Sequence, residues 1–348
     1  MSMITKKPRI LMVYTGGTIG MIEDAETHAL RPFDFTHLMD NVPKVKKLDY
    51  EIDNIQFNPP IDSSDMNLEH WRLIARSIAD NYDRYDGFVV LHGTDTMAYT
   101  ASALSFMLQG LSKPVIITGS QLPIGEVRTD GEENLITALQ IAAAKDPDGS
   151  GPMVREVAIL FENYLWRGNR STKRSADNFN AFKSHNYPAL AKIGLGIHFE
   201  PKALARPAAG TTLHPMYEMN PAVVVIDLYP GLDARTLNHL LNTPGIRGVI
   251  LRTYGAGNGP TDRWFMDCIK NGIGRGLAIL NVTQCGNGGV HATRYVGGEM
   301  LTGIGVVSGH DLTFEAAITK MMFLLAQDLT TTQLRYRLAV PLCGEMSY

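Results

Sequence analysis

The chain has 348 residues, a length that favours two domains of ordinary size over one. Its 32 Lys and Arg residues nearly balance 35 Asp and Glu residues, which leaves a formal net charge of -3. This balance argues against nucleic acid or an anionic membrane as a partner, because both require concentrated positive charge. Hydrophobic residues make up 45% of the chain and charged residues 19%, as is typical of a folded globular protein.

The N-terminus resembles a secretory signal only superficially. Lys6, Lys7 and Arg9 precede an apolar run, but that run covers only residues 10–14 before Gly16 and the glycine after it. No stretch approaches the roughly 20 apolar residues that a membrane-spanning helix requires.

The three cysteines, Cys268, Cys285 and Cys343, show neither CxxC spacing nor an accompanying histidine cluster. We therefore expect no disulfide framework and no zinc site. Together with the short N-terminal apolar run, this cysteine usage leads us to expect a cytoplasmic protein.

Short β-branched runs alternate with segments of helical period, which predicts βαβ units around a buried, mostly parallel sheet. The fold class is thus α/β. The expected strands are residues 10–14, 87–91, 114–118, 157–161, 222–228, 248–253 and 277–282. The expected helices are residues 97–109, 132–144, 234–241, 312–327 and 331–339.

A change of composition divides the chain. Residues 201–221 contain four prolines and show no clear period, so residues 203–221 are the predicted linker. The predicted domains are residues 1–202 and 222–348. Ligands of open α/β sheets bind beyond the carboxyl ends of the strands, so the loops that follow the strands are the candidate site.

The first strand-end loop reads TGGTIG over residues 15–20. Its glycines allow a tight turn and a close approach to a ligand, and hydroxyl groups flank them. A dinucleotide loop is disfavoured because G-x-G-x-x-G is absent, no helix clearly follows, and the acidic residues at 23–26 would repel a pyrophosphate. A plain turn remains an alternative.

The second loop places Thr94 and Asp95 at the start of a helix. Both residue types cap helices, so capping alone is one interpretation. The other is chemical: a hydroxyl is a weak nucleophile that needs a base, and a partly desolvated lysine can serve as one. Lys173, from a later loop, is the candidate base, with Asp95 holding its ammonium group. A solvated surface lysine is the alternative.

A polar segment precedes the helix that contains Trp71. Ser63 and Ser64 in this segment can donate hydrogen bonds to a carboxylate, and the backbone amides add to such a site. The alternative is again a helix cap, formed by Ser64 or Asp65.

Taken together, these loops resemble the bacterial type I, cytoplasmic L-asparaginase family. The similarity covers nearly the whole chain. It implies a larger N-terminal catalytic α/β domain, a smaller C-terminal α/β domain, a homodimer or homotetramer, and hydrolysis of L-asparagine to L-aspartate and ammonia with no metal or organic cofactor. The motifs that carry it are, in order, TGGTIG, DSSDM, LHGTDTMAYTASALSFML, TGSQLP, RGNRSTK, IDLYPG, LRTYGAGNGP, NVTQCGNGG and SGHDLT.

The resemblance also assigns catalytic roles. Thr18 matches the family's first-loop nucleophile, which we favour as the residue that forms an acyl-enzyme. Thr94, Asp95 and Lys173 match a second triad that activates water or relays protons.

Substrate contacts carry over in the same way. Ser63 matches the residue that holds the α-carboxylate of the substrate, with Asp62 and Ser64 beside it. Thr94 and Asp95 complete the expected substrate site, and Asp95 matches the carboxylate that receives the α-ammonium group.

One departure from the family concerns the loop after the first motif. Many members carry a tyrosine there that orients the nucleophile, but residues 22–32 contain none. His28 is a candidate substitute, with a solvent-exposed loop histidine as the alternative. We expect Tyr14 to lie in the core and the loop to be mobile.

Type I relatives can also bind asparagine at a separate effector site near a subunit interface. The matching residues are Arg252 and Cys285, with Thr172 adjoining. Because Thr172 precedes Lys173, an effector there would couple to the catalytic loop. A small buried thiol is the alternative for Cys285.

Two other functions compete with this interpretation. The first is the asparaginase-like subunit of a tRNA-dependent amidotransferase, but that branch carries extra N-terminal sequence, whereas TGGTIG begins here at Thr15. The negative net charge also disfavours an RNA surface. The second is a catalytically silent amino-acid sensor, which is disfavoured because all four expected reactive residues are present.

Overall fold

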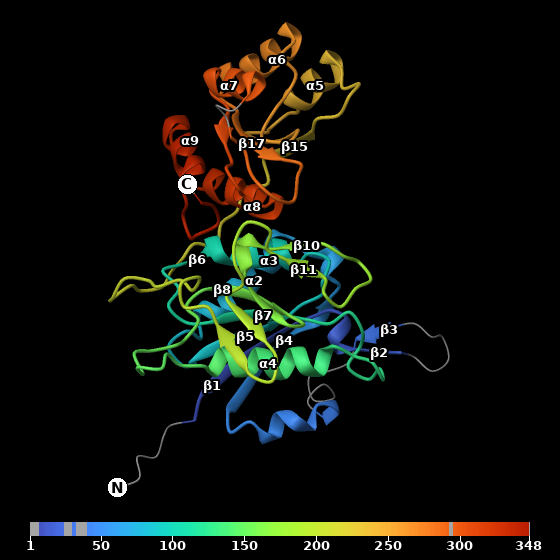
Figure 1. The fold of residues 1–348 in the computed structure, drawn as a ribbon, viewed down its shortest axis with the longest axis vertical. Helices are drawn as coiled ribbons and strands as arrows, with labels where there is room; N and C mark the ends of the chain where they lie inside the picture. The colour runs from blue at the N-terminus through green and yellow to red at the C-terminus, as the bar shows by residue number, and fades with distance from the viewer. Residues whose placement is uncertain (1–6, 24–29, 33–39, 292–294, 348) are drawn as a thin grey trace. The chain divides into compact units, whose positions relative to one another are not determined.

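The computed structural model describes residues 7–23, 30–32, 40–291 and 295–347 (Figure 1). The chain divides into two compact units, Met1–Tyr217 and Glu218–Tyr348. Each unit has a parallel-dominated sheet and its own hydrophobic core. The predicted α/β fold, with a larger N-terminal and a smaller C-terminal part, is confirmed.

The first unit is built on an eight-stranded sheet. Its strands are β1 (Arg9–Gly16), β4 (Glu51–Ile61), β5 (Gly87–Leu91), β7 (Val115–Thr118), β8 (Val157–Phe161), β9 (Tyr164–Arg167), β12 (Ala191–Ile193) and β13 (Ile197–Phe199). They lie in the order β13-β12-β9-β8-β7-β5-β1-β4. The five strands from β4 to β8 in this order run parallel, and the three beyond β8 are antiparallel. All five residues of β5 and of β8 are buried, as expected for the middle of a parallel sheet.

Helices cover both faces of this sheet (Figure 1). They are α2 (Leu68–Ala79), α3 (Met97–Met107) and α4 (Gly131–Ala143). Asn67 caps α2 by accepting from the amides of Glu69 and His70, and the buried residues Trp71, Ile74 and Ile78 recur at helical spacing. Helix α4 packs on the face that carries alternate residues of β1, while α2 and α3 lie on the opposite face.

The edge strand β4 is the longest described strand that the hydrophobic pattern did not predict. Its first residues are mostly polar and exposed, and Pro59 and Pro60 interrupt its end. An edge strand needs neither full burial nor a complete row of amide donors, so both signals for a strand are weak there. The seven strands that were predicted all occur, with ends that differ by at most one residue except at β1.

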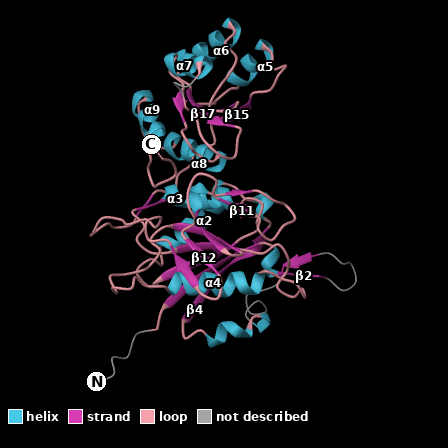
Figure 2. Cartoon of the chain, viewed as in Figure 1, coloured by secondary structure: helices cyan, strands magenta, loops and turns pink. Residues whose placement is uncertain are grey.

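The second unit contains a four-stranded parallel sheet in the order β15-β16-β17-β18. Figure 2 labels β15 and β17 of this sheet. These strands are β15 (Val223–Asp227), β16 (Gly248–Thr253), β17 (Ala278–Thr283) and β18 (Val307–Ser308). Its helices are α5 (Ala234–Leu241), α6 (Arg263–Gly274), α7 (Val296–Gly303), α8 (Phe314–Leu325) and α9 (Thr331–Ala339). The described helices include none that is long and apolar enough to cross a membrane.

Short elements complete the chain. They are the hairpin β2 (Met21–Glu23) with β3 (Leu30–Pro32), the pair β10 (Thr172–Lys173) with β11 (Phe182–Lys183), and the pair β6 (Leu108–Gln109) with β14 (His214–Pro215). The β14 strand falls inside the stretch predicted as a linker. Ala203 and Leu204, at the start of that stretch, are buried in the core of the first unit. Much of residues 203–217 therefore packs as part of the first unit.

A buried ion pair ties the C-terminal segment to α8. Lys320 and Glu345 are both fully buried, with Lys320 Nζ 2.7 Å from a Glu345 oxygen. Lys320 also donates to the carbonyls of Leu338 and Val340. Burial lowers the pKa of Lys320, and the Glu345 carboxylate opposes that change. The cost of burying the two charges is thus offset by contacts that each charge makes.

We expect Lys320→Met to lower the free energy of unfolding by about 3–5 kcal/mol, because it leaves the Glu345 carboxylate buried without its counter-charge, with only backbone amides donating to it. Adding Glu345→Gln recovers part of that loss, since a neutral amide oxygen still accepts from the backbone. Chemical denaturation followed by circular dichroism measures both, with the exposed Lys270→Met as control. A loss below about 1 kcal/mol for Lys320→Met would contradict the assigned role.

Candidate active site

Three of the predicted site segments meet at Gly93, just beyond the carboxyl end of β5. A Cβ atom on Gly17 would lie 2.4 Å from the Gly93 nitrogen, and one on Gly93 would lie 2.5 Å from Ser63 Oγ. Thr96 Oγ1 adds a hydrogen bond of 2.7 Å to the Ser63 carbonyl. The loop after β1, the Asp62–Ser64 segment and the loop after β5 are thus in direct contact.

Thr94, Asp95 and Lys173 form the hydrogen-bonded group that was predicted. Lys173 Nζ lies 2.8 Å from Thr94 Oγ1 and 2.7 Å from Asp95 Oδ1. Thr94 is buried and the Lys173 side chain is 18% exposed, whereas that of Asp95 is 64% exposed. A lysine held at this distance can exchange a proton with the threonine hydroxyl, and the hydrogen bond to the carboxylate orients the lysine.

The start of α3 decides between capping and chemistry for these residues. The N-cap is Thr96, and no side chain caps the helix there. Thr94 and Asp95 instead contact Lys173, which is 79 and 78 residues further along the chain. The capping interpretation therefore does not account for their positions.

A salt bridge and an aromatic ring anchor the loop that carries Lys173. Arg167 Nε lies 2.6 Å from Glu156 Oε2, and both side chains are nearly buried. The guanidinium groups of Arg167 and Arg170 each lie over the ring of Tyr187, at 4.3 and 5.0 Å from its centroid. These contacts fix the loop at its base, three residues before Lys173.

Thr18 opens a short 3-10 turn, Thr18–Gly20, directly after the contact between Gly17 and Gly93. The fully buried Tyr14 donates from its hydroxyl to the Gly20 carbonyl at 2.9 Å. Burial raises the pKa of Tyr14 to about 12, so the phenol keeps its proton. Tyr14 is a core residue, as expected, and it also holds the turn that carries Thr18.

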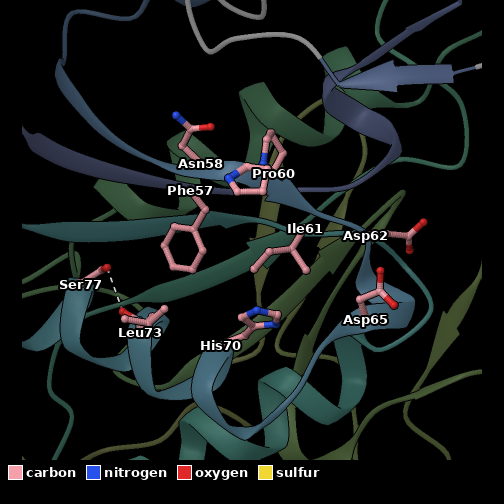
Figure 3. A pocket seen from close by; sticks show the side chains of 10 residues that line it. Phe57, Asn58, Pro60, Ile61, Asp62, Asp65, His70, Leu73 and Ser77 are labelled. Atoms are coloured by element: carbon pink, nitrogen blue, oxygen red, sulfur yellow. Dashed lines mark hydrogen bonds between the residues drawn. The ribbon is translucent and has the colours of Figure 1, made fainter.

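The Asp62–Ser64 segment presents one buried and two exposed side chains. Ser63 is buried, whereas Asp62 accepts from both the amide and the hydroxyl of Ser64 at 2.9 Å. Asp62 and Ser64 thus act on each other as a cap, while Ser63 faces Gly93. Beside this segment lies a cavity of about 500 Å³ between β4 and α2, with Phe57 and Ile61 on one side and His70 on the other (Figure 3).

Gln121 is a further site residue, which the sequence marks only as part of the TGSQLP motif. Thr94 Oγ1 donates to Gln121 Oε1 at 3.3 Å, and Gln121 Nε2 donates to the carbonyls of Ala176 and Asn178. The Asp130 carboxylate accepts from the backbone amide of Gln121. The sequence signal that could have identified Gln121 is its position after a third parallel strand, because the loops that follow parallel strands meet at one edge of the sheet.

Two of the three residues matched to an effector site lie at or just after the ends of neighbouring strands of the second unit. Arg252, at the end of β16, forms an ion pair of 2.9 Å with Asp227, and its guanidinium lies over Phe314. Cys285 follows β17 and is exposed, so the buried-thiol alternative is wrong. Thr172 belongs to β10 of the first unit, next to Lys173.

Two further points concern His28 and metal binding. His28, and with it the expected mobility of its loop, falls in residues 24–29, which the structure does not describe. Among the residues that it does describe, no cluster of three or more His, Cys, Asp or Glu side chains could hold a metal ion.

Comparison with known proteins gives matches over nearly the whole chain. Residues 9–205 match the family model "Asparaginase, N-terminal", and residues 222–337 match "Glutaminase/Asparaginase C-terminal domain". L-asparaginase 1 of Escherichia coli K12 is 42% identical, over 98% of this chain and 99% of that protein. The crystal structure of L-asparaginase I from Vibrio cholerae superposes with a TM-score of 0.86 at 38% identity, over 99% and 100% of the two chains. A glutamyl-tRNA(Gln) amidotransferase subunit of Pyrococcus abyssi is 30% identical, over 98% of this chain and 77% of that protein.

We expect Gly17→Ala to destabilise the protein more than a glycine substitution that causes backbone strain alone. Gly17 has a φ of 92° and its added methyl group would overlap the Gly93 backbone. Gly149→Ala is the matched control, because its φ is 73° but no atom lies within 4 Å of the new methyl group. Strain at a positive φ costs about 1–2 kcal/mol, so thermal unfolding of the control should show that loss alone. Equal losses in the two variants would contradict the close contact.

Proposed function

The chain belongs to the asparaginase family, and on that basis we propose that it hydrolyses L-asparagine to L-aspartate and ammonia. The observation that carries the proposal is the group of Thr94, Asp95 and Lys173, in which the lysine bonds both partners within 2.8 Å. The same unit places Thr18 one residue from the contact between the first two loops. Hydroxyl groups, a lysine and a carboxylate are sufficient for amide hydrolysis without a cofactor.

In the first half of the proposed reaction, the Thr18 hydroxyl attacks the side-chain amide carbon of asparagine. A C–O bond forms, the carbonyl oxygen becomes an oxyanion, and backbone amides of the glycine-rich loops stabilise its charge. Collapse of this intermediate breaks the C–N bond. The nitrogen leaves as ammonia after taking a proton, and a β-aspartyl ester of Thr18 remains.

In the second half, water attacks the ester and regenerates Thr18. We assign proton transfer in these steps to the Thr94–Lys173–Asp95 relay. Thr94 Oγ1 lies between Lys173 Nζ and the Gln121 amide oxygen, so its hydroxyl has both a donor and an acceptor beside it. The exposed Asp95 carboxylate holds the Lys173 side chain in place beside Thr94.

We assign the two charged ends of the substrate to Ser63, beside the relay, and to Asp95, within it. Ser63 holds the α-carboxylate, with Asp62 and Ser64 beside it, and Asp95 receives the α-ammonium group. Lys173 occupies one oxygen of Asp95, and the side chain's 64% exposure leaves room for a second cation. A zwitterionic substrate is thus bound by local charges of both signs.

Regulation and assembly form a second part of the proposal. We assign Arg252, Cys285 and Thr172 to an effector site for asparagine in a cytoplasmic homodimer or homotetramer. Arg252 lies in β16 and Cys285 comes two residues after the adjacent parallel strand β17, and the Gln284 side chain donates to the Arg252 carbonyl, so the two positions are structurally linked. The ion pair with Asp227 is the contact that an effector's carboxylate would compete for.

We expect Thr18→Ala to lower kcat for L-asparagine by about 10⁴-fold or more, because the covalent step is lost. Lys173→Met should lower kcat comparably through loss of the relay, whereas the exposed Lys192→Met should leave it unchanged. Ammonia release is measured side by side for L-asparagine and L-glutamine. The proposal fails if the wild-type protein releases no ammonia from asparagine, or if Thr18→Ala retains activity.

The effector proposal predicts sigmoidal initial rates against asparagine in the wild-type protein. Arg252→Ala should give hyperbolic rates with little change in the limiting rate, because only the coupling between the two sites is removed. Arg235→Ala, at a nearly fully exposed arginine of the same unit, is the control and should stay sigmoidal. Hyperbolic wild-type kinetics would refute the effector site.

A further inference from the structure

His92 is completely buried beside the proposed catalytic residues, yet no step assigned above uses it. It lies directly after β5, and its backbone amide donates to the Thr118 carbonyl of the neighbouring strand. Its imidazole has a polar atom at each end. Nδ1 lies 2.6 Å from the Gly93 carbonyl oxygen, and Nε2 lies 2.8 Å from Thr100 Oγ1.

These contacts determine which ring nitrogen carries the proton. A carbonyl oxygen can only accept, so the short contact at Nδ1 requires an N–H there. At the other end, the Trp71 indole can only donate, and its Nε1 lies 2.9 Å from Thr100 Oγ1. The Thr100 hydroxyl therefore accepts from Trp71 and donates to His92 Nε2. Burial lowers the pKa of His92 to about 4, which keeps the ring neutral near pH 7.

The result is a directed hydrogen-bond chain that ends on the peptide in front of Thr94. It runs from Trp71 through Thr100 and His92 to the Gly93 carbonyl. A trans peptide is planar, so fixing the Gly93 carbonyl also fixes the Thr94 amide, which points the opposite way. Glycine has more backbone freedom than any other residue, so this peptide needs an outside constraint.

We propose that His92, as the neutral Nδ1–H tautomer, is a positioning residue that holds the Gly93–Thr94 peptide and thereby aims the Thr94 hydroxyl and amide. Thr100 sets the tautomer and Trp71 sets the direction of the Thr100 hydroxyl. The role rests on the proposed function, because it orients the residues assigned there. It assigns no proton transfer to His92, since both ring nitrogens are occupied by buried partners.

The chain also links two parts of the site. Trp71 belongs to α2, the helix that begins shortly after the Asp62–Ser64 segment, and Thr100 belongs to α3, which begins shortly after Asp95. The Trp71–Thr100 hydrogen bond thus joins the helix behind the expected carboxylate site to the helix behind the relay, and His92 connects this bond to the Gly93 peptide. Directional hydrogen bonds can fix the orientation of a peptide plane, which apolar packing between helices does not do by itself.

Two substitutions of His92 separate positioning from simple core packing. In His92→Asn, the side-chain amide nitrogen can replace Nδ1 and still donate to Gly93. In His92→Gln, the amide group reaches the Thr100 position and loses the bond to Gly93. We expect kcat for asparagine to stay within about 10-fold of wild type in His92→Asn and to fall about 100-fold in His92→Gln, because a misplacement of about 1 Å costs roughly that factor. KM should change less than kcat in both variants.

Substitution of Thr100 tests the same chain from its far end. Thr100→Val should lower kcat and Thr100→Ser should restore it, because serine retains the hydroxyl. The matched control is Thr319→Val in α8, which also removes the hydroxyl of a fully buried helical threonine. It should cost comparable stability in thermal unfolding and leave kcat unchanged.

The imidazole itself gives a readout that does not depend on activity. In ¹⁵N-labelled wild-type protein, the His92 ring should show a protonated Nδ1 and an unprotonated Nε2 near pH 7. A protonated Nε2 would overturn the proposal, as would folded His92→Asn and His92→Gln variants with equal losses of kcat. If the wild-type protein shows the expected tautomer but releases no ammonia from asparagine, the proposed function fails while the hydrogen-bond chain stands.

Discussion

Three loops can meet in the first unit only because neither Gly17 nor Gly93 has a Cβ atom. The Gly17 backbone rests on the Gly93 nitrogen, and Ser63 occupies the space where a side chain of residue 93 would lie. Thr18, Ser63 and Thr94 are each within one residue of this contact. The relative positions of the proposed nucleophile, carboxylate site and relay therefore depend on one close approach of backbones. Lys173 reaches this site from the loop that follows β9.

Much of this arrangement follows from the sequence, for a physical reason. Buried parallel strands are continuous β-branched runs, so β5, β7 and β8 were predictable, and parallel strands necessarily bring their following loops to one edge. The contact between Lys173 and Thr94 was not predictable in this way, because it joins residues 79 positions apart through a hairpin. Residue chemistry made Lys173 a candidate base for the Thr94 hydroxyl, with a surface lysine as the alternative, and the resemblance to a family placed the two in one triad. Gln121 and the His92 chain depend on side-chain directions inside the packed unit, which the hydrophobic pattern does not determine.

The limits of the pattern are equally clear at the edges of the sheet. Polar Glu51 and Asp53 and the prolines at 59 and 60 hide β4, although its eleven residues make it the longest strand described. The stretch predicted as a linker shows a second limit of the pattern. Its prolines suggest an open connection, yet Ala203 and Leu204 are buried and β14 pairs with β6. Proline content reports on missing amide donors and says little about burial.

The near-neutral net charge of the chain is consistent with the charges at the proposed site. Its balance is repeated locally, since the site sets Asp95 against Lys173 and the base of the Lys173 loop sets Glu156 against Arg167. Such pairs have short-range fields, which suit a small substrate with one charge of each sign. A large single-sign surface would attract polyelectrolytes instead.

The composition of β4 also bears on how the protein remains apart from its neighbours in a crowded solution. A long strand at the margin of a sheet is a template on which another chain can add a strand, the first step toward insoluble assemblies. Here the strand begins with charged residues, including Glu51 and Asp53, and ends at Pro59 and Pro60, which have no amide hydrogen to offer. An added strand would have to bury charged side chains at one end and would find amide donors missing at the other. The charged residues and prolines that make β4 hard to recognise in the sequence thus also disfavour the addition of a foreign strand beside the proposed site.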